Sequence, residues 1–211
     1  MLDFEKFTEA LQQRLLLPLP GREAQVKMAP YPVEEKRFRE DPERPAKPSG
    51  VMVLLYPHEG EIYLPLMKRP TYPGAHSGQV SFPGGKFEPE DTDFIQTALR
   101  ETREEIGVAE EQVSLLGSLT ELFIIASNFK VYPSVGYVPE RPVFLPDPVE
   151  VVEVLEVSLT DLRDESKKGI KEMRFGEHVI HSPYFDVQGH VVWGATAMML
   201  SELIHITEKL S

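Results

Sequence analysis

The chain of 211 residues contains no cysteine and no long apolar run. The lack of cysteine excludes disulfide bonds, thiolate zinc sites and a cysteine nucleophile. Because a membrane-spanning helix needs about 18 or more consecutive apolar residues, the sequence predicts no membrane span and no membrane partner. The first residues, MLDFEKF, carry acidic side chains and lack the basic and apolar regions of a signal peptide, so we expect a cytoplasmic protein.

Basic residues are scarce relative to acidic ones, with 22 Lys and Arg against 34 Asp and Glu and a net charge of −12. This balance disfavours binding through a basic surface, so we expect no nucleic-acid partner. Residues 1–50 are neutral, whereas residues 88–111 hold nine acids and two bases, a net charge of −7. Since apolar residues recur through that stretch at helical spacing, we interpret it as one face of a helix.

The hydrophobic pattern predicts one α/β domain over residues 46–211, preceded over residues 1–45 by a helix and an irregular connection. The predicted helices are residues 3–16, 92–106 (ended by Gly107) and 194–209. The stretch 18–48 is predicted to be irregular, and residues 161–171 to be turn-like with a short helix. The predicted strands are 51–56, 62–68, 79–82, 113–122, 131–137 and 150–158, with a hairpin formed by 179–180 and 184–187.

Three glutamates occupy the end of the predicted helix at residues 92–106. Glu101, Glu104 and Glu105 stand at i, i+3 and i+4, so we expect their carboxylates to converge on one face. Each like-charge pair costs about 0.2–0.5 kcal/mol, and the helix C-terminus disfavours anions. A divalent cation such as Mg²⁺ requires such carboxylates. Taken alone, the pattern favours a solvated acidic face neutralised by Arg100 and Arg103, and the surrounding residues change that interpretation.

Those residues resemble the signature of the Nudix hydrolases, which is Gly, five residues, Glu, seven residues, then Arg-Glu-apolar-x-Glu-Glu-x-Gly-apolar. The corresponding string here is Gly85-x5-Asp91-x8-Arg100-Glu101-Thr102-Arg103-Glu104-Glu105-Ile106-Gly107-Val108. It departs from the signature in three ways: Asp91 replaces the first Glu, one extra residue follows it, and Thr102 takes an apolar position. The first two departures leave the role of Asp91 open.

This resemblance implies an α/β/α sandwich with a mixed sheet and a loop-helix-loop metal site. Glu101, Glu104 and Glu105 would bind Mg²⁺ or Mn²⁺, and the enzyme would hydrolyse a diphosphate joined to another group. Glu104 is the first candidate for the general base, and Arg100 would hold it by an i,i+4 ion pair. Glu150 is a second candidate base or an extra metal ligand, and it is equally interpretable as a surface acid at the start of a strand.

Residues outside the signature resemble the coenzyme A pyrophosphatase subfamily. The similar segments are Leu64–Arg69, His76–Gly85, Ser127–Phe129 and the Trp193-Gly194 pair. The resemblance implies that coenzyme A or its thioesters are hydrolysed to 3′,5′-ADP and (acyl-)4′-phosphopantetheine.

Within these segments, five residues are candidates for substrate binding. Lys68 and Arg69, at a strand end, are expected to contact phosphate. His76 is equally interpretable as a structural residue, and Gln79 and Asn128 as turn residues.

Two other functions stay open. One is hydrolysis of another nucleoside diphosphate derivative, such as ADP-ribose, NADH or a nucleotide sugar. Ile124 counts mildly against ADP-ribose, since enzymes for that substrate tend to carry a proline about sixteen residues past the signature. The other is a non-catalytic nucleotide-binding module, although such modules usually have a degraded set of glutamates. A homodimer is possible, and the role of residues 1–45 is open.

Overall fold

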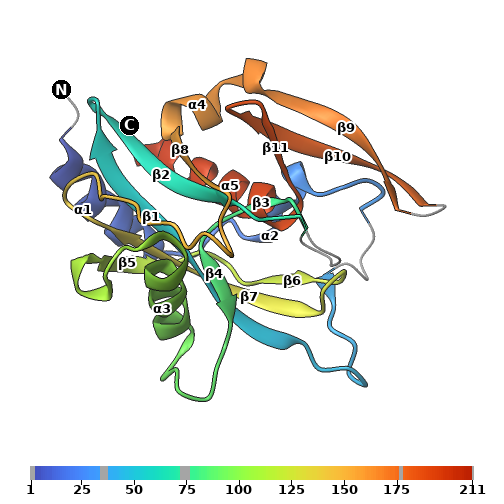
Figure 1. Cartoon of the computed structure of the whole chain (residues 1–211). Helices are drawn as coiled ribbons and strands as arrows, with labels where there is room; N and C mark the ends of the chain where they lie inside the picture. Colours follow the sequence, from blue (N-terminus) through green and yellow to red (C-terminus); the bar gives the residue numbers. More distant parts are fainter. Residues whose placement is uncertain (1–2, 34–37, 72–76, 176–177, 211) are drawn as a thin grey trace.

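A mixed β-sheet forms the centre of the fold (Figure 1). The computed structural model describes residues 3–33, 38–71, 77–175 and 178–210. The strands of the central sheet are β1 (Lys47–His58), β2 (Glu61–Lys68), β3 (Val80–Ser81), β4 (Gly84–Lys86), β5 (Ser114–Ser118), β6 (Leu122–Ile124), β7 (Phe129–Tyr137) and β8 (Glu153–Ser158). Their order is β3-β2-β1-β7-β5, while β4 pairs with β1, β6 with β7 and β8 with β2. β1 and β7 run parallel, and the other pairs are antiparallel.

Helices cover both faces of this sheet, which confirms the expected α/β/α sandwich. The helices are α1 (Phe4–Leu15), α2 (Arg22–Gln25), α3 (Phe94–Ile106), α4 (Leu159–Arg163) and α5 (Gly194–Thr207). Successive side chains of β1 point to opposite faces. Met52 and Leu54 pack in one cluster with Ala98 of α3, whereas Val53 and Leu55 belong to the cluster that contains α5. Burying each such aliphatic side chain contributes roughly 1.5–3 kcal/mol. Within the described ranges, no helix is long and apolar enough to cross a bilayer.

The predicted hairpin of residues 179–180 and 184–187 is wrong. A second sheet consists of β9 (Lys168–Phe175), β10 (His178–Val187) and β11 (His190–Trp193), with β10 continuous in the middle. Pro183 lies between the two predicted segments, and proline lacks the backbone donor that a central strand needs. In the structure Pro183 pairs with Ile170 of β9, and pairing with β11 begins only at Tyr184. The strand therefore passes through the proline where it has one strand partner.

The N-terminal segment packs onto the core. Leu11 and Leu15 of α1 belong to the same buried cluster as the central strands. The stretch predicted as irregular contains α2 and a 3₁₀ turn, Val26–Met28. Buried Glu202 of α5 accepts hydrogen bonds from the Gly21 backbone N–H (3.1 Å) and the Gln25 side chain (2.9 Å). These bonds tie the segment to α5 and satisfy a carboxylate that would otherwise be costly to bury.

The helix that carries the glutamates has defined ends. Asp93 caps α3 by accepting a hydrogen bond from the Gln96 backbone N–H. At the other end Gly107 is left-handed, with a φ of 76°, as predicted for the residue that ends this helix. A Cβ on Gly107 would lie 2.6 Å from Cβ of Leu145, so the loop around Leu145 packs closely against the end of α3.

Candidate active site

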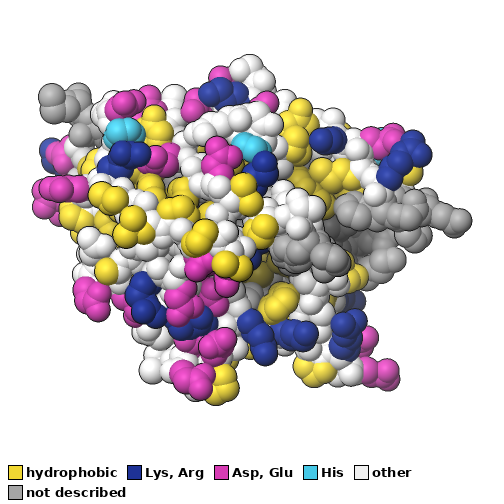
Figure 2. All heavy atoms as spheres, in the orientation of Figure 1, with side chains coloured by type: hydrophobic (Ala, Val, Ile, Leu, Met, Phe, Trp, Pro, Cys, Tyr) yellow, Lys and Arg dark blue, Asp and Glu magenta, His cyan; other side chains and the backbone are white. Residues whose placement is uncertain are grey.

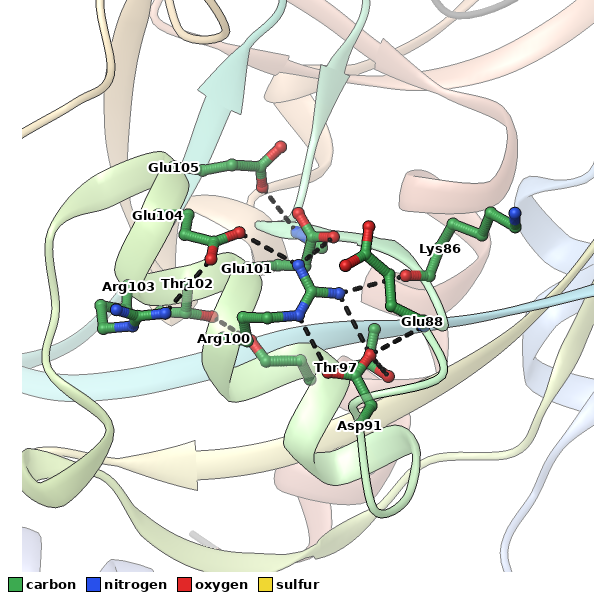
Figure 3. A network of polar contacts seen from close by, with 12 residues as sticks. Lys86, Glu88, Asp91, Thr97, Arg100, Glu101, Thr102, Arg103, Glu104 and Glu105 are labelled. Atoms are coloured by element: carbon green, nitrogen blue, oxygen red, sulfur yellow. Dashed lines mark hydrogen bonds and ion pairs between the residues drawn. The ribbon is translucent and has the colours of Figure 1, made fainter.

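The last two turns of α3 direct their three glutamates to two different environments (Figure 3). The side chain of Glu105 is 2% exposed and that of Glu101 is 13% exposed, whereas that of Glu104 is 49% exposed. α3 packs against β1 and β4, so the glutamates at i and i+4 are enclosed there. The predicted single face is thus divided into two enclosed carboxylates and one at the solvent edge.

Arg100 lies at the centre of the carboxylates and contacts three of them. Its Nη1 lies 3.0 Å from Glu101 Oε1 and 3.0 Å from Glu104 Oε2. The second contact is the i,i+4 pair expected from the sequence. Nη2 donates to the carbonyl of Lys86, the last residue of β4 (3.2 Å), and Figure 3 shows Arg100 reaching from α3 to this strand. The guanidinium of Arg100 therefore offsets the repulsion between the carboxylates of Glu101 and Glu104.

Asp91, whose role the sequence left open, is the third carboxylate on Arg100. It accepts hydrogen bonds from Arg100 Nε (2.9 Å) and Nη2 (3.1 Å), Thr97 Oγ1 (2.8 Å) and the Glu88 backbone N–H (3.0 Å). The hydrogen bond from Arg100 lowers the pKa of Asp91 to about 2. Paired bonds of a guanidinium to one carboxylate fix its orientation. Asp91 thus orients the arginine that contacts Glu101 and Glu104.

Arg69 forms a separate clamp on Glu105. Its Nη2 lies 3.1 Å from Glu105 Oε1 and 3.0 Å from the Gly84 carbonyl oxygen, and its Nε donates to Ser81 Oγ (3.2 Å). The Gly84 backbone N–H donates to Glu105 Oε2 (2.7 Å). Both oxygens of this buried carboxylate are therefore paired. The structure places Arg69, predicted to contact phosphate, on a protein carboxylate.

The enclosed glutamates hold protons more tightly than usual. Burial raises the pKa of Glu105 to about 8, against the opposing charge of Arg69. Burial also raises the pKa of Glu101, against Arg100. The charge of Glu150 adds to both increases, so Glu150 faces the same cluster. A bound divalent cation would favour the ionised forms of these carboxylates.

The loop that carries Glu150 is joined to α3 through the backbone. The Asp147 N–H donates to the Glu105 carbonyl (3.0 Å), and the Glu150 N–H donates to Asp147 Oδ1 (3.2 Å). Glu150 lies in a turn and is exposed. The structure thus brings Glu150 to the edge of the glutamate cluster on an exposed turn before β8.

The donor set fits a hard divalent cation. A Cβ on Gly85 would lie 2.2 Å from Glu101 Oε1, so the carboxylate of Glu101 can take its present position only beside a glycine. Carboxylate oxygens are the ligands that Mg²⁺ and Mn²⁺ prefer. In the part of the chain that the structure describes, no three acidic or histidine side chains surround one metal position, and Glu104 and Glu105 each contact an arginine. Glu101, Glu104 and Glu105 would hold the cation in exchange for these arginine contacts.

Two further predicted binding residues lie at the ends of the β2–β3 connection. Lys68 ends β2, and its carbonyl accepts a hydrogen bond from the Val152 N–H (2.9 Å). The Gln79 carbonyl accepts from the Arg69 N–H (2.9 Å). These bonds place Lys68 and Gln79 next to the residue that clamps Glu105. His76 lies outside the described residues.

Asn128 occupies a turn before β7. Its φ is 57°, its side-chain amide donates to the Pro45 carbonyl (3.0 Å) and its own carbonyl accepts from the Lys47 N–H (2.8 Å). Asn tolerates this left-handed conformation better than most residues. The contacts of Asn128 thus hold the start of β1 against β7, and the structure does not bring it together with the glutamates.

The sequence analysis did not predict that Arg69 contacts Glu105 or that Asp91 orients Arg100. The signal for Asp91 was present in the signature, but the extra residue before Arg100 obscured it. For Arg69 the sequence offered only an arginine after a strand. Its position opposite Ser81 and Gly84 depends on the pairing of β2 with β3 and of β4 with β1, which becomes visible only in three dimensions.

A carboxylate-rich helix beside a glycine-containing strand, on a mixed sheet between helices, defines a class of hydrolases. Residues 46–175 match the NUDIX domain. The chain is 34% identical over 191 residues to Nudix hydrolase 15, mitochondrial, of Arabidopsis thaliana, covering 87% of this chain and 64% of that protein. It is 36% identical over 140 residues to the uncharacterized Nudix hydrolase NudL of Photorhabdus laumondii, covering 65% and 73%. The chain therefore belongs to the Nudix hydrolase family.

Solved structures share the fold at low sequence identity. A Nudix hydrolase from M. smegmatis, RenU, is 15% identical with a TM-score of 0.55, covering 80% of this chain and 88% of that one. The MutT protein from Methanosarcina mazei is 18% identical with a TM-score of 0.53, covering 80% and 99%. Hydrolases of this family generally use divalent cations such as Mg²⁺ or Mn²⁺. The chain spans 64% and 54% of the length of the two Arabidopsis relatives it matches.

Proposed function

We propose that the chain is a divalent-cation-dependent hydrolase that cleaves the diphosphate bridge of coenzyme A or its thioesters. The products are 3′,5′-ADP and (acyl-)4′-phosphopantetheine. The observation that carries the proposed chemistry is the cluster of Glu101, Glu104 and Glu105, in which two carboxylates are enclosed and resist ionisation. Enclosed carboxylates with raised pKa values are common at sites that bind a cation or transfer a proton.

The glutamates of the cluster have different proposed roles. When bound, the cation polarises a phosphoryl oxygen and lowers the pKa of a water molecule. Glu101, Glu104 and Glu105 would hold it, and Gly85 leaves the space that Glu101 requires. Glu104 is the most exposed of the three and is oriented by Arg100 and Arg103, so it accepts the proton of the attacking water. Glu150, at the edge of the cluster, is the second candidate for this step.

The choice of coenzyme A is supported by sequence and charge. The segment from His76 to Gly85 follows the pattern of the coenzyme A pyrophosphatase subfamily. A chain of net charge −12 repels a substrate with a diphosphate and a separate 3′-phosphate, unless a cation screens the bridge. Cation dependence and a polyanionic substrate therefore support each other.

A panel of diphosphates tests this proposal. Values of kcat/KM are measured for coenzyme A, ADP-ribose, NADH and a nucleotide sugar with Mg²⁺ and with Mn²⁺. Coenzyme A is expected to have the highest value. A higher value for ADP-ribose would reject coenzyme A as the substrate while keeping the chemistry. Binding without turnover of any diphosphate would indicate a non-catalytic module.

A further inference from the structure

An exposed row of aliphatic side chains borders the glutamate cluster. Val143, Leu145, Val149 and Val152 are between 60% and 79% exposed. We refer to these four residues as the apolar strip. Contiguous apolar side chains on the surface of a soluble protein often mark a binding surface, whereas single ones are common.

The strip has a fixed backbone. The Leu145 N–H donates to the Ile106 carbonyl (2.9 Å), and the Val152 N–H donates to the Lys68 carbonyl (2.9 Å). Two prolines, at positions 146 and 148, further restrict the chain between these anchors, and a third, at position 142, precedes them. The aliphatic side chains are thus presented at a defined place between the end of α3 and the end of β2.

Neighbouring residues of the same loop face inward. Phe144 contacts the ring of Tyr56 edge-on, with centroids 5.9 Å apart, and Val151 is buried in the cluster under α3. The inward residues account for the packing of the loop. Leu145 also packs against the end of α3, whereas Val143, Val149 and Val152 belong to neither buried cluster, so core packing does not account for these three.

The strip adjoins the proposed reaction centre. Asp147, between Leu145 and Val149, donates its N–H to the Glu105 carbonyl (3.0 Å). Glu150, between Val149 and Val152, acts electrostatically on Glu105. Figure 2 shows hydrophobic side chains gathered next to the charged groups over α3. The loop that carries the strip therefore adjoins the glutamate cluster.

The charged residues around the apolar strip indicate which kind of group can bind there. Residues 140–153 contain four acids and one base, and that base, Arg141, is paired with Glu156 (Nε to Oε2, 2.7 Å). This net charge of −3 repels phosphates and anionic lipid surfaces. It also opposes a two-fold contact between copies, which would bring the same acids face to face. An uncharged apolar group is the occupant that fits.

We propose that the apolar strip binds the uncharged, apolar arm of the diphosphate substrate, such as the acyl chain of a coenzyme A thioester. The diphosphate lies at Glu101, Glu104 and Glu105, and the polyanionic nucleotide end points away from the strip. This inference rests on the proposed function and adds a preference for substrates that carry an apolar chain.

The test compares coenzyme A, acetyl-, butyryl- and octanoyl-coenzyme A in the wild type and in a Val143→Ser/Val149→Ser variant. In the wild type, KM is expected to fall about tenfold from the acetyl to the octanoyl thioester, as partial burial of the added methylenes predicts. The variant is expected to lose this dependence while kcat for coenzyme A is unchanged. The matched control is Ile170→Ser on β9, which removes an equally exposed aliphatic side chain of the second sheet and should keep the dependence.

The outcomes separate the two proposals. A KM that is independent of chain length, or a dependence that survives in the double variant, would overturn the strip as a binding site and leave the diphosphatase intact. Vesicle binding or dimer formation that is lost in the double variant, with unchanged KM values, would also overturn it. If no diphosphate is hydrolysed, the proposed function fails. Calorimetric titration of octanoyl-coenzyme A then decides the strip alone: weaker binding by the variant supports it, and equal affinity overturns it.

Discussion

Glu105 and Arg69 form an enclosed ion pair, with Nη2 of Arg69 3.1 Å from Oε1 of a carboxylate that is 2% exposed. The Gly84 N–H holds the other oxygen at 2.7 Å. This pair joins the end of β2 to the last turn of α3, and it determines where one of the three glutamates lies. It also means that Arg69 acts on the site through Glu105.

The Arg69–Glu105 pair predicts a strong energetic coupling. Above pH 8, where Glu105 is ionised, Arg69→Gln leaves a buried carboxylate without its cation, so we expect the free energy of unfolding to fall by about 3 kcal/mol. Glu105→Gln in the same chain removes the uncompensated charge and should restore part of that loss. Urea unfolding of the two single variants and the double variant measures the coupling. Additive effects of the two substitutions would show that the pair contributes nothing as a unit.

The Asp91–Arg100 contact predicts a dependence of stability on pH. The pKa of Asp91 is lowered in the folded protein, from 3.8 to about 2, so its stabilising effect is present above pH 3.8 and is lost as the pH falls towards 2. The difference between these values corresponds to roughly 2 kcal/mol. The free-energy difference between the wild type and Asp91→Asn should therefore shrink between pH 5 and pH 2. A difference that stays constant over this range would contradict the lowered pKa.

Glu104 is predicted to affect catalysis much more than stability. Because its side chain is half-exposed, Glu104→Gln should change the unfolding free energy by no more than about 0.5 kcal/mol. Loss of a general base lowers kcat by about 10²–10⁴-fold. Glu111→Gln, an exposed acid in the turn after α3, is the matched control and should retain full activity. A wild-type kcat in a folded Glu104→Gln variant would show that Glu104 is not the general base and would leave Glu150 as the candidate.

Gly85 is predicted to control access of Glu101 to the cation. A methyl group on Gly85 would collide with Oε1 of Glu101, so Gly85→Ala displaces this carboxylate. We expect Mn²⁺ affinity to fall about 10- to 100-fold, the usual range when a metal ligand loses its support. Titration of Mn²⁺ followed by electron paramagnetic resonance measures this without any turnover. An unchanged affinity would exclude Glu101 from the ligand set.

The fold was predictable where the periodicity is strong. The short apolar run at residues 51–56 predicted β1, the amphipathic pattern predicted α3, and Gly107 marked the end of that helix. β10 was not predictable, because whether Pro183 breaks a strand depends on which neighbours pair on either side. The hydrogen bond between Glu202 and Gly21 was not predictable either, because the two residues lie far apart in the sequence.

The residue types at the site could be predicted, but not their partners. Local spacing placed Glu104 within reach of Arg100, and this contact is present, whereas the contact of Arg100 with Glu101 was not predicted. The same spacing could not show that Glu105 turns inward to Arg69, because that depends on the packing of β2 against α3 through Gly84. Helical periodicity describes which side chains share a face, whereas tertiary packing decides which of them are enclosed.

The most direct test is identification of the products formed from coenzyme A with Mg²⁺ and, in parallel, with excess EDTA. The account predicts equal amounts of 3′,5′-ADP and 4′-phosphopantetheine with Mg²⁺ and no cleavage with EDTA. Undiminished cleavage with EDTA, or no cleavage of coenzyme A with Mg²⁺, would contradict it.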